Sequence, residues 1–404
     1  MNIVILPSWH PDKNNPLAGL FFREQAIGLA RQYPQVNFHF IEINSNDFLL
    51  SPRFLYKSIY NLIKFTFSSK NISIDRLNSN LLIYRKNHIN WSFLHFKKLR
   101  ELYFYCILKK NINIIEMDYG KISLLHAHVS FPSGFNCYKL KEEFNIPFVI
   151  TEHMGPFPFA VFDNKKDLFE RYIKKSLHES NRVISISHYM RNEIIKKVHR
   201  DSIVIPNMCN ESVFYPKEKR INNKNFTFIV VCSSLSKEKG IDNLFYAIKR
   251  STLEMSAIHF NIIGNGIKMQ NYMYLAKTLN IENFITFYGI RNRLETAELY
   301  RNADAFIQPS EIESFSIACI EALATGIPIL STICGGPEDI VNENNGILVK
   351  NKSIEDLANG IISMINKYHL YNQNDIRNEF MEKYSEIAVC NKIMACYLDV
   401  TKNN

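Results

Sequence analysis

The sequence has no apolar run close to the roughly 18–20 residues that a membrane-spanning helix needs. Its start, MNIVILPSWHP, has neither a basic segment nor a small-residue cleavage site, so we expect no signal peptide and predict a buried strand at Ile3–Leu6. The eight cysteines form no Cys-x-x-Cys pair, which argues against a disulfide framework or a zinc site. These absences predict a cytoplasmic protein.

A dinucleotide-binding fingerprint is also missing. That fingerprint needs Gly-x-Gly-x-x-Gly after a strand, with an acidic residue about 20 positions later. The best match, Gly264-Asn265-Gly266, has Met269 where the third glycine should stand. A dinucleotide-dependent enzyme is therefore disfavoured.

The composition is that of an ordinary globular protein. Of the 404 residues, 46% are hydrophobic and 22% are charged, and the length suits two domains. Residues 1–220 hold 31 Lys and Arg against 19 Asp and Glu, whereas the whole chain holds 48 against 39. A basic first half beside a near-neutral second half indicates that the two halves face different partners.

Short β-branched or aromatic runs alternate with stretches long enough for helices, which is typical of parallel α/β sheets. The polar segment 207–225 predicts a linker between a Rossmann-like domain at 1–206 and a second at 226–370, followed by a helical segment at 371–404 that can pack back on the first domain. Ligands of such sheets bind at the carboxyl ends of the strands, so two facing domains predict a cleft. The expected strands are Asn2–Leu6, Phe38–Ile43, Leu81–Tyr84, Ile122–His126, Phe148–Thr151, Val183–Ser187, Ile203–Ile205, Phe226–Val231, His259–Ile263, Phe284–Tyr288, Ala305–Gln308, Ile327–Leu330 and Ile347–Val349.

The segment ESFSIACIEALATGIPIL places two carboxylates, Glu313 and Glu321, eight positions apart in an apolar stretch. It follows an expected strand and predicts a helix that begins near Phe315. The amides of Ser314, Phe315 and Ser316 would then be unpaired first-turn N–H groups, which suit a diphosphate. The two carboxylates could accept hydrogen bonds from sugar hydroxyls. On spacing alone, a capping Glu313 and a surface Glu321 are equally consistent.

Glycine-rich turns surround this segment. IIGNG ends a strand at Gly264 and Gly266, GGPEDIV opens a short helix, and SSLSKEKG places Lys237 and Lys239 just before another helix. Each turn alone is a weak signal, because most such turns are only structural. All of them, however, lie at the expected carboxyl ends of strands of one sheet, where phosphate-binding groups should converge.

Residues 226–349 resemble the nucleotide-sugar domain of the retaining glycosyltransferases of family 4 (group 1), which have the GT-B fold. The Glu-x7-Glu element is the hallmark of that family, and GNG, ITFYGI, LYRNADAFIQPSEIES, EALATGIPIL, GGPEDIV and NNGILV follow in its order and spacing. The first half is similar more loosely, through PLAGLFFREQ, LLHAHVSFPSG, IPFVITEH and IPNMCNESVFYP. The resemblance covers most of residues 1–365. It implies GT-B architecture, with two Rossmann-like domains whose parallel sheets face each other across a cleft.

The resemblance implies roles for individual residues. Glu313 would contact hydroxyls of the transferred sugar, and Glu321 would contact the ribose of the nucleotide. Lys239 would bind the donor diphosphate, and Gly19 would let backbone amides approach it. His153 would lie near the reacting sugar carbon, as a second catalytic residue beside Glu313.

This chain departs from the family at Ser234, where an Arg is common, and Lys237 is the candidate to replace that charge. The family also has Gly more often than Ser at Ser314 and Ser316. No Asp-x-Asp occurs, so the metal-binding carboxylate pair of the other large glycosyltransferase fold is missing, and we expect no metal. By resemblance, we expect the anomeric configuration to be retained.

His126 and His128 flank Ala127 near a strand end, so both imidazoles point to one face. Metal binding would need a third ligand, so we expect a structural or acceptor-side role. The segments Phe54–Lys70 and Tyr84–Lys110 mix aromatic with basic residues. They are interpreted either as an interface to anionic lipid or as crossover helices with an aromatic core face.

The expectation is a cytoplasmic glycosyltransferase, peripheral at the inner face of the plasma membrane. It would move a sugar from a UDP- or GDP-sugar to a hydroxyl of a glycan or lipid-linked acceptor, in the biosynthesis of bacterial surface polysaccharide such as capsule, O-antigen or exopolysaccharide. We expect no cofactor and no nucleic-acid partner. Two alternatives stay open, a catalytically idle GT-B nucleotide-binding scaffold and a nucleotide-sugar epimerase of the same fold.

Overall fold

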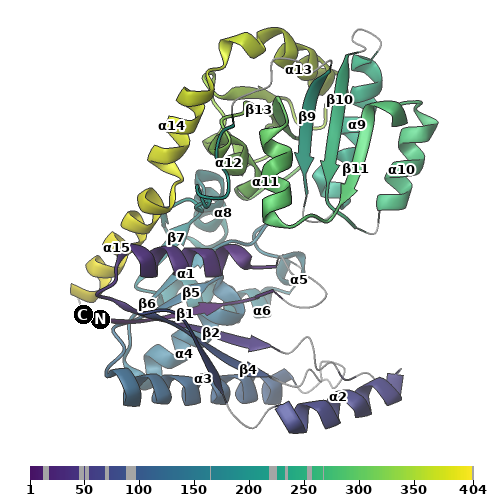
Figure 1. Ribbon diagram of the computed structural model, residues 1–404. Coiled ribbons are helices and arrows are strands. Elements are labelled where there is room, and N and C mark those ends of the chain that lie inside the picture. The colour runs from purple at the N-terminus through teal and green to yellow at the C-terminus, as the bar shows by residue number, and fades with distance from the viewer. Residues whose placement is uncertain are drawn as a thin grey trace.

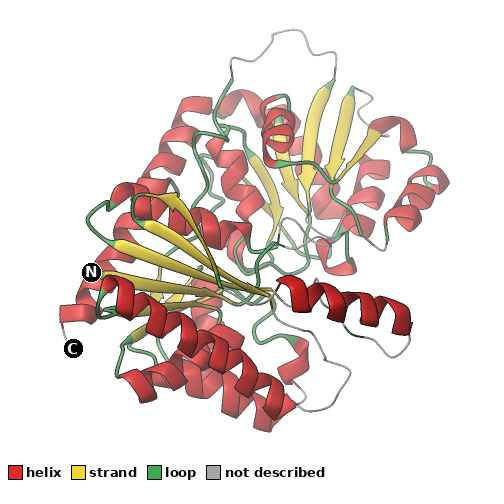
Figure 2. Ribbon diagram, turned by 60° about the horizontal axis from the view of Figure 1, so that its bottom comes forward, coloured by secondary structure: helices red, strands yellow, loops and turns green. Residues whose placement is uncertain are grey.

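The computed structural model contains two α/β domains, one above the other in Figure 1. It describes residues 1–11, 18–44, 50, 54–68, 72–87, 97–163, 165–217, 225–232, 235–252, 257–266 and 268–402. Helices cover the faces of both sheets, as Figure 2 shows. The cleft between the two sheets is the candidate functional site.

The first domain is built on an eight-stranded sheet in the order β3-β4-β2-β1-β5-β6-β7-β8. All neighbouring strands run parallel except β3, which is antiparallel to β4. Every residue of β5 and β6 is buried, as expected for parallel strands covered on both faces. The strands are β1 (Asn2–Pro7), β2 (Asn37–Asn44), β3 (Ser73–Asn78), β4 (Leu81–Asn87), β5 (Leu124–His128), β6 (Phe148–Glu152), β7 (Arg182–Ser185) and β8 (Ile203–Val204).

The α-helices of this domain are the crossovers between its strands. They are α1 (Leu20–Gln32), α2 (Leu55–Ser68), α3 (Lys97–Tyr119), α4 (Phe135–Phe144), α5 (Ala160–Asp163), α6 (Lys166–Leu168), α7 (Lys175–Glu179) and α8 (His188–Val198).

The second domain has a six-stranded, fully parallel sheet in the order β11-β10-β9-β12-β13-β14. The strands are β9 (Phe226–Val231), β10 (Ile258–Ile263), β11 (Ile285–Gly289), β12 (Ala305–Gln308), β13 (Ile329–Thr332) and β14 (Gly346–Val349). Its α-helices are α9 (Ile241–Ser251), α10 (Met269–Thr278), α11 (Arg293–Arg301), α12 (Ile317–Ala324) and α13 (Ile354–Lys367).

The last two helices connect the domains. α14 (Gln373–Lys383) packs on α12, and α15 (Glu386–Lys402) descends to the first domain and packs on α1 (Figure 1). Arg31 forms a bidentate pair with Glu386, whose side chain is 5% exposed. At the far end of α15, the buried Tyr397 hydroxyl lies 2.6 Å from His126 Nδ1. The C-terminal helix therefore belongs to the core of the first domain.

The two parallel Rossmann-like sheets confirm the predicted fold class, while the strand list needs one correction. β3 was not predicted, because its sequence SIDRLN is polar and its residues are almost all exposed. It forms an antiparallel edge on β4, where burial is not required. Between β8 and β9, the described residues 205–217 and 225 form no helix or strand.

We predict that Tyr397→Phe destabilises the protein more than Tyr33→Phe does. Removing the Tyr397 hydroxyl leaves His126 Nδ1 buried without this partner, which costs about 1–3 kcal/mol. Tyr33 also bonds across the α1–α15 contact, to Asn391, but at an exposed position where water can replace it. Thermal unfolding of the two variants measures the difference. Equal shifts in the unfolding midpoint would contradict this account of the contact.

Candidate active site

The carboxyl ends of the two sheets face each other across a cleft of about 710 Å³. Residues that follow strands of both domains line it. From the first domain these are Trp9, His153 and Ile186, and from the second they are Cys232, Gly264, Ile290 and Gln308. The cleft lies where parallel sheets place their ligand sites.

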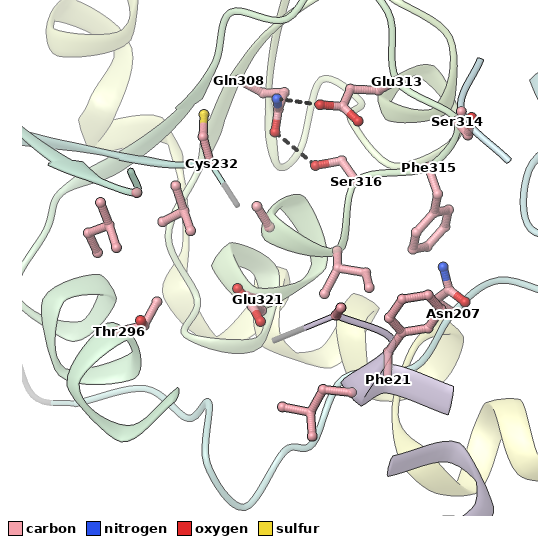
Figure 3. Close-up of a pocket in the computed structure, with 18 of the residues that line it drawn as sticks. Phe21, Asn207, Cys232, Thr296, Gln308, Glu313, Ser314, Phe315, Ser316 and Glu321 are labelled. Atoms are coloured by element: carbon pink, nitrogen blue, oxygen red, sulfur yellow. Dashed lines mark hydrogen bonds between the residues drawn. The ribbon is translucent and has the colours of Figure 1, made fainter. Parts of the chain in front are cut away.

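Glu313 lies in the loop after β12, and its backbone is fixed by a bridge to Gly335. Its carboxylate oxygen Oε1 accepts hydrogen bonds from Lys239 Nζ at 2.6 Å, Ser310 Oγ at 2.9 Å and Gln308 Nε2 at 3.1 Å. The Gln308 bond is drawn in Figure 3. Among the described residues, Oε2 has no hydrogen-bond partner. One oxygen therefore orients the carboxylate, and the other is left for a ligand.

Lys239 supplies the positive charge beside Glu313. It lies in a single 3-10 turn, Lys237–Lys239, and its side chain is 24% exposed. Burial acts to lower the pKa of Lys239, but the charge and hydrogen bond of Glu313, together with the nearby Cys232 and Cys334, more than offset it and raise the pKa above its usual value. The ammonium is therefore held charged at the cleft.

The α12 helix begins two residues later than the sequence predicts. Ser316 is its N-cap and adopts φ 88°, and its hydroxyl accepts a hydrogen bond from the Cys319 amide. The same hydroxyl donates to Gln308 Oε1 at 2.9 Å (Figure 3). The first-turn amides are consequently those of Ile317, Ala318 and Cys319 rather than those of residues 314–316. Ile317 and Ala318 line the cleft.

Ser314 joins the two domains. Its hydroxyl donates to the Met154 carbonyl at 2.8 Å, and its own carbonyl accepts from Ser187 Oγ at 2.6 Å. A Cβ at Gly155 would lie 2.5 Å from Ser314 Oγ, so the two loops are in close contact. Ser314 lines the cleft, but its polar side chain bonds to the other domain.

Glu321 lies one helical turn inside α12 and is 6% exposed. Its Oε1 is 3.2 Å from Arg293 Nη1, and Arg293 Nε is 3.0 Å from Oε1 of Glu24 on α1. Arg293 Nε and Nη2 are buried and form no hydrogen bond with the described residues. The contacts of Arg293 with Glu24 and Glu321 are thus ion pairs without the alignment of a hydrogen bond. The Arg293 guanidinium also lies 5.0 Å from the centre of the Phe214 ring. Arg293 connects carboxylates of both domains in the cleft.

Burial raises the pKa of the Glu321 carboxyl to about 7, although the Arg293 charge opposes the rise. Burial also raises the pKa of Glu24, again against the Arg293 charge. Arg293 therefore faces the carboxyl groups of both Glu24 and Glu321, and ionising both of them at once is unfavourable.

His153 lies after β6, lines the cleft and is 9% exposed. Its Nε2 is 3.1 Å from Nδ1 of His128, which is fully buried. His126 is also fully buried and bonds to Thr151 Oγ1 at 2.7 Å and to Tyr397. Neither His126 nor His128 lines the cleft, so their burial favours the structural role over the acceptor-side one.

Two glycines of the cleft are explained by close backbone approaches. Gly19 caps α1 at φ 65°, and a Cβ there would lie 2.6 Å from the Trp9 carbonyl oxygen. Gly264 adopts φ 140°, and a Cβ there would lie 2.1 Å from the Cys232 carbonyl oxygen. Only glycine fits either position without distortion.

The structure gathers most of the predicted residues in the cleft and leaves a few outside it. Lys237 is exposed, and Gly266 lies beside Leu235. Neither Lys237 nor Gly266 lines the cleft. Ser234 lies outside the described residues. The cleft-lining predictions are Gly19, His153, Lys239, Gly264, Glu313, Ser314, Phe315, Ser316 and Glu321.

Three polar residues of the site were not predicted. Gln308 ends β12, and Arg293 begins α11 just after β11, so both follow a strand at the expected sheet edge. That position was the available signal for both. Glu24 lies in the middle of α1, where nothing in the sequence distinguishes it from a surface residue.

Two family models match the chain. The model described as Glycosyl transferases group 1 matches residues 214–381, and the model described as Glycosyltransferase Family 4 matches residues 79–213. The chain belongs to the family 4, group 1 glycosyltransferases. The resemblance predicted from the Glu-x7-Glu element and its surrounding motifs is confirmed.

Similar proteins support this glycosyltransferase assignment. The chain is 28% identical over 306 residues to an uncharacterized glycosyltransferase of Methanocaldococcus jannaschii, over 74% of this chain and 82% of that protein. It is 28% identical over 249 residues to a Bacillus subtilis glycosyltransferase named for teichuronic acid biosynthesis, over 59% of this chain and 60% of that protein. The crystal structure of Anabaena HepE in complex with UDP has a TM-score of 0.67 at 16% identity, over 99% of this chain and 100% of that chain. That likeness shows the fold, and the glycosyltransferase has the GT-B architecture.

Within the described ranges, no helix of this glycosyltransferase is long and apolar enough to cross a membrane. In the same residues, no group of three or more His, Cys, Asp and Glu is placed to hold a metal ion.

We predict that Glu321→Gln becomes more stable relative to the wild type as the pH rises. The folded Glu321 keeps its proton up to about pH 7, whereas the unfolded residue loses it near pH 4.3. The folded wild type therefore binds more protons in this window, and its stability falls by about 2–3 kcal/mol relative to the variant between pH 5 and 7.

Chemical unfolding of both proteins at several pH values from 5 to 8 measures this difference. Glu355→Gln is the control, because Glu355 pairs with Arg250 in solvent and is 65% exposed. A Glu321→Gln difference that stays constant with pH would contradict the raised pKa.

Proposed function

We propose that the protein transfers a sugar from a nucleoside-diphosphate sugar to a hydroxyl of a glycan or lipid-linked acceptor, with retention of configuration and without a metal ion. The observation that carries the proposal is the Lys239–Glu313 pair beside the start of α12, inside a cleft shared by both domains. UDP in the related Anabaena structure supports a nucleotide donor, with UDP- and GDP-sugars as the first candidates.

The donor diphosphate is proposed to lie at the start of α12, near Lys239. The Ile317 and Ala318 amides belong to the first helical turn, and the helix dipole favours an anion there. When the bond to the sugar breaks, negative charge grows on the leaving phosphate, and fixed positive groups stabilise that charge. The sequence has no Asp-x-Asp pair, so these groups take the place of a metal in the proposal.

The sugar and the ribose are proposed to bind the two glutamates. Glu313 offers Oε2 to sugar hydroxyls, because Oε1 is already engaged by three donors. Glu321 offers its carboxyl to the ribose from the second turn of α12, near Arg293. His153 faces the cleft from the other domain, so donor and acceptor would meet between the sheets. The leaving phosphate oxygen would take the proton of the acceptor hydroxyl.

An acceptor at a membrane surface is proposed from α2, which lies at the lower edge of the molecule in Figure 1. Leu55, Tyr56, Ile59 and Tyr60 are between 52% and 87% exposed, and the helix contains lysines but no acidic residue. Such a surface suits anionic lipid at the inner face of a plasma membrane. In α3, by contrast, Leu108, Ile112 and Ile115 are buried, as in the core alternative, and the exposed apolar residues Leu102 and Met117 lie nearly at opposite ends of the helix.

A role in bacterial surface polysaccharide biosynthesis is proposed on two grounds. The Bacillus subtilis relative is named for teichuronic acid biosynthesis. The first half of the chain, which would meet the acceptor, is the basic half with the exposed apolar helix α2. The two grounds together favour an acceptor carried on a lipid.

We predict that Glu313→Gln lowers sugar transfer roughly 100-fold or more, because Lys239 loses its partner and the sugar loses a charged acceptor. The binding of UDP alone should persist, because UDP carries no transferred sugar. Transfer from UDP- and GDP-sugars and thermal shifts with UDP, GDP, ADP, CMP and dTDP measure the two effects.

Glu311→Gln is the matched control, because Glu311 pairs with Lys352 and does not line the cleft. Unchanged turnover in Glu313→Gln would exclude the proposed role of that carboxylate. Nucleotide binding without any transfer would favour the idle scaffold, and an altered free sugar nucleotide would favour an epimerase.

We predict that Tyr56→Glu with Ile59→Glu abolishes binding to vesicles that contain anionic phospholipid. Both side chains lie on one exposed face of α2, and carboxylates there would oppose insertion and charge attraction. Co-sedimentation at low and high salt measures the binding. Leu370→Glu, at a 66% exposed apolar position of the second domain, should bind as the wild type does. Equal binding by all three proteins would exclude α2 as the contact.

A further inference from the structure

His128 and His153 share one hydrogen bond, and each has a second ring nitrogen without a partner. Nδ1 of His128 lies 3.1 Å from Nε2 of His153. Nε2 of His128 and Nδ1 of His153 are buried and make no hydrogen bond with any part of the chain that the structure describes. Neutral imidazole carries one N–H and one acceptor nitrogen, so through the shared bond the tautomer of one ring determines the tautomer of the other.

Both rings are neutral. Burial lowers the pKa of His153 to about 3, and the nearby His126 lowers it as well. Burial lowers the pKa of His128 well below its usual value. Two arrangements therefore remain, with the shared proton on either His128 Nδ1 or His153 Nε2.

The two arrangements differ in where they leave an unpaired N–H. If His153 donates, the unpaired N–H is Nε2 of His128, which is 0% exposed and does not line the cleft. If His128 donates, the unpaired N–H is Nδ1 of His153, a cleft-lining residue. A buried N–H without an acceptor costs about 1–3 kcal/mol, and bare acceptors are tolerated better. The arrangement that a cleft ligand can complete is favoured.

Among the residues that the structure describes, no carboxylate accepts a hydrogen bond from the His153 ring. Glu152 is fully buried, and its Oε1 accepts from the backbone amides of His153 at 2.9 Å and Met154 at 3.0 Å. Its Oε2 accepts from the Ser130 amide at 3.0 Å. Glu152 thus fixes the backbone of His153 and leaves the ring to His128.

Aromatic packing fixes the orientation of the His128 ring. The His128 ring stacks on Phe22 with centroids 4.5 Å apart and lies 4.3 Å from the His126 ring. Phe22 also meets His153 edge-on at 5.0 Å. The direction of the His128 N–H is therefore set by the core of the first domain.

We propose that His128 is a positioning residue that donates its Nδ1–H to Nε2 of His153, so that His153 presents Nδ1–H to an oxygen of the bound nucleotide sugar. The contact between His153 and the nucleotide sugar rests on the proposed function. The tautomer assignment needs no nucleotide sugar, because it follows from the hydrogen bond, the two unpaired nitrogens and the place of His153 at the cleft. His153 then acts as a neutral hydrogen-bond donor.

The test is NMR of the full-length protein labelled with ¹⁵N-histidine, in which two-bond ¹H–¹⁵N couplings distinguish the two tautomers. His153→Gln assigns the resonance. We expect the Nδ1–H tautomer for His153 in the wild type, which would support the proposal. An Nε2–H tautomer or an imidazolium at pH 7 would overturn it. If His153→Gln does not fold, His153→Asn assigns the resonance in its place.

Variants of His128 test its role as a positioning residue for His153. His128→Asn keeps an N–H near the position of Nδ1 and should keep the His153 tautomer, whereas His128→Leu should switch it to Nε2–H. His126→Leu is the matched control, because His126 is equally buried but does not bond to His153. A His153 tautomer that is unchanged in His128→Leu would overturn the positioning role.

UDP and UDP-glucose are the ligand probes, with thermal shift as the independent measure of binding. A change of the His153 Nδ1 resonance on binding would support the ligand contact. Binding of both probes without such a change would overturn it. Absence of any nucleotide binding would instead count against the proposed function and leave the tautomer result standing.

Discussion

The carboxyl ends of two parallel sheets meet at one cleft, and the polar loops of the site depend on this constraint. Parallel strands bring their loops to a single edge, so residues far apart in the sequence converge without any local signal. His153 follows β6, Gln308 ends β12, and Lys239 lies after β9. The apolar strands therefore align the polar loops. Loss of a core strand would destroy the fold and, with it, the site.

Within that cleft, the buried charges are held in pairs. Lys239 is held by Glu313, and Arg293 is shared by Glu24 and Glu321. Each cation keeps a carboxylate in place, and each carboxylate keeps a cation charged in a partly buried site. The cleft is thus organised before a ligand enters, which reduces the reorganisation that binding requires.

The sequence was sufficient for the parallel strands and for placing Glu313 and Glu321 at the cleft, since apolar runs and strand ends are local features. It was not sufficient for contacts between domains. The Ser314 amide was predicted to belong to the first turn of α12, but the helix begins at Ile317, and the Ser314 hydroxyl bonds to Met154 of the other domain. Glu24 joins Arg293 only because α1 lies against the second domain at this point, and no spacing within α1 encodes that. The start of α12 was misplaced because Ser316 caps the helix in an unusual backbone conformation.

The return of α15 to the first domain has a consequence for biosynthesis. Tyr397, which follows the whole second domain in the chain, completes the buried surroundings of His126 on β5. A ribosome therefore releases this core element of the first domain only after it has made the second domain. The first domain therefore cannot complete its core while the second domain is being made.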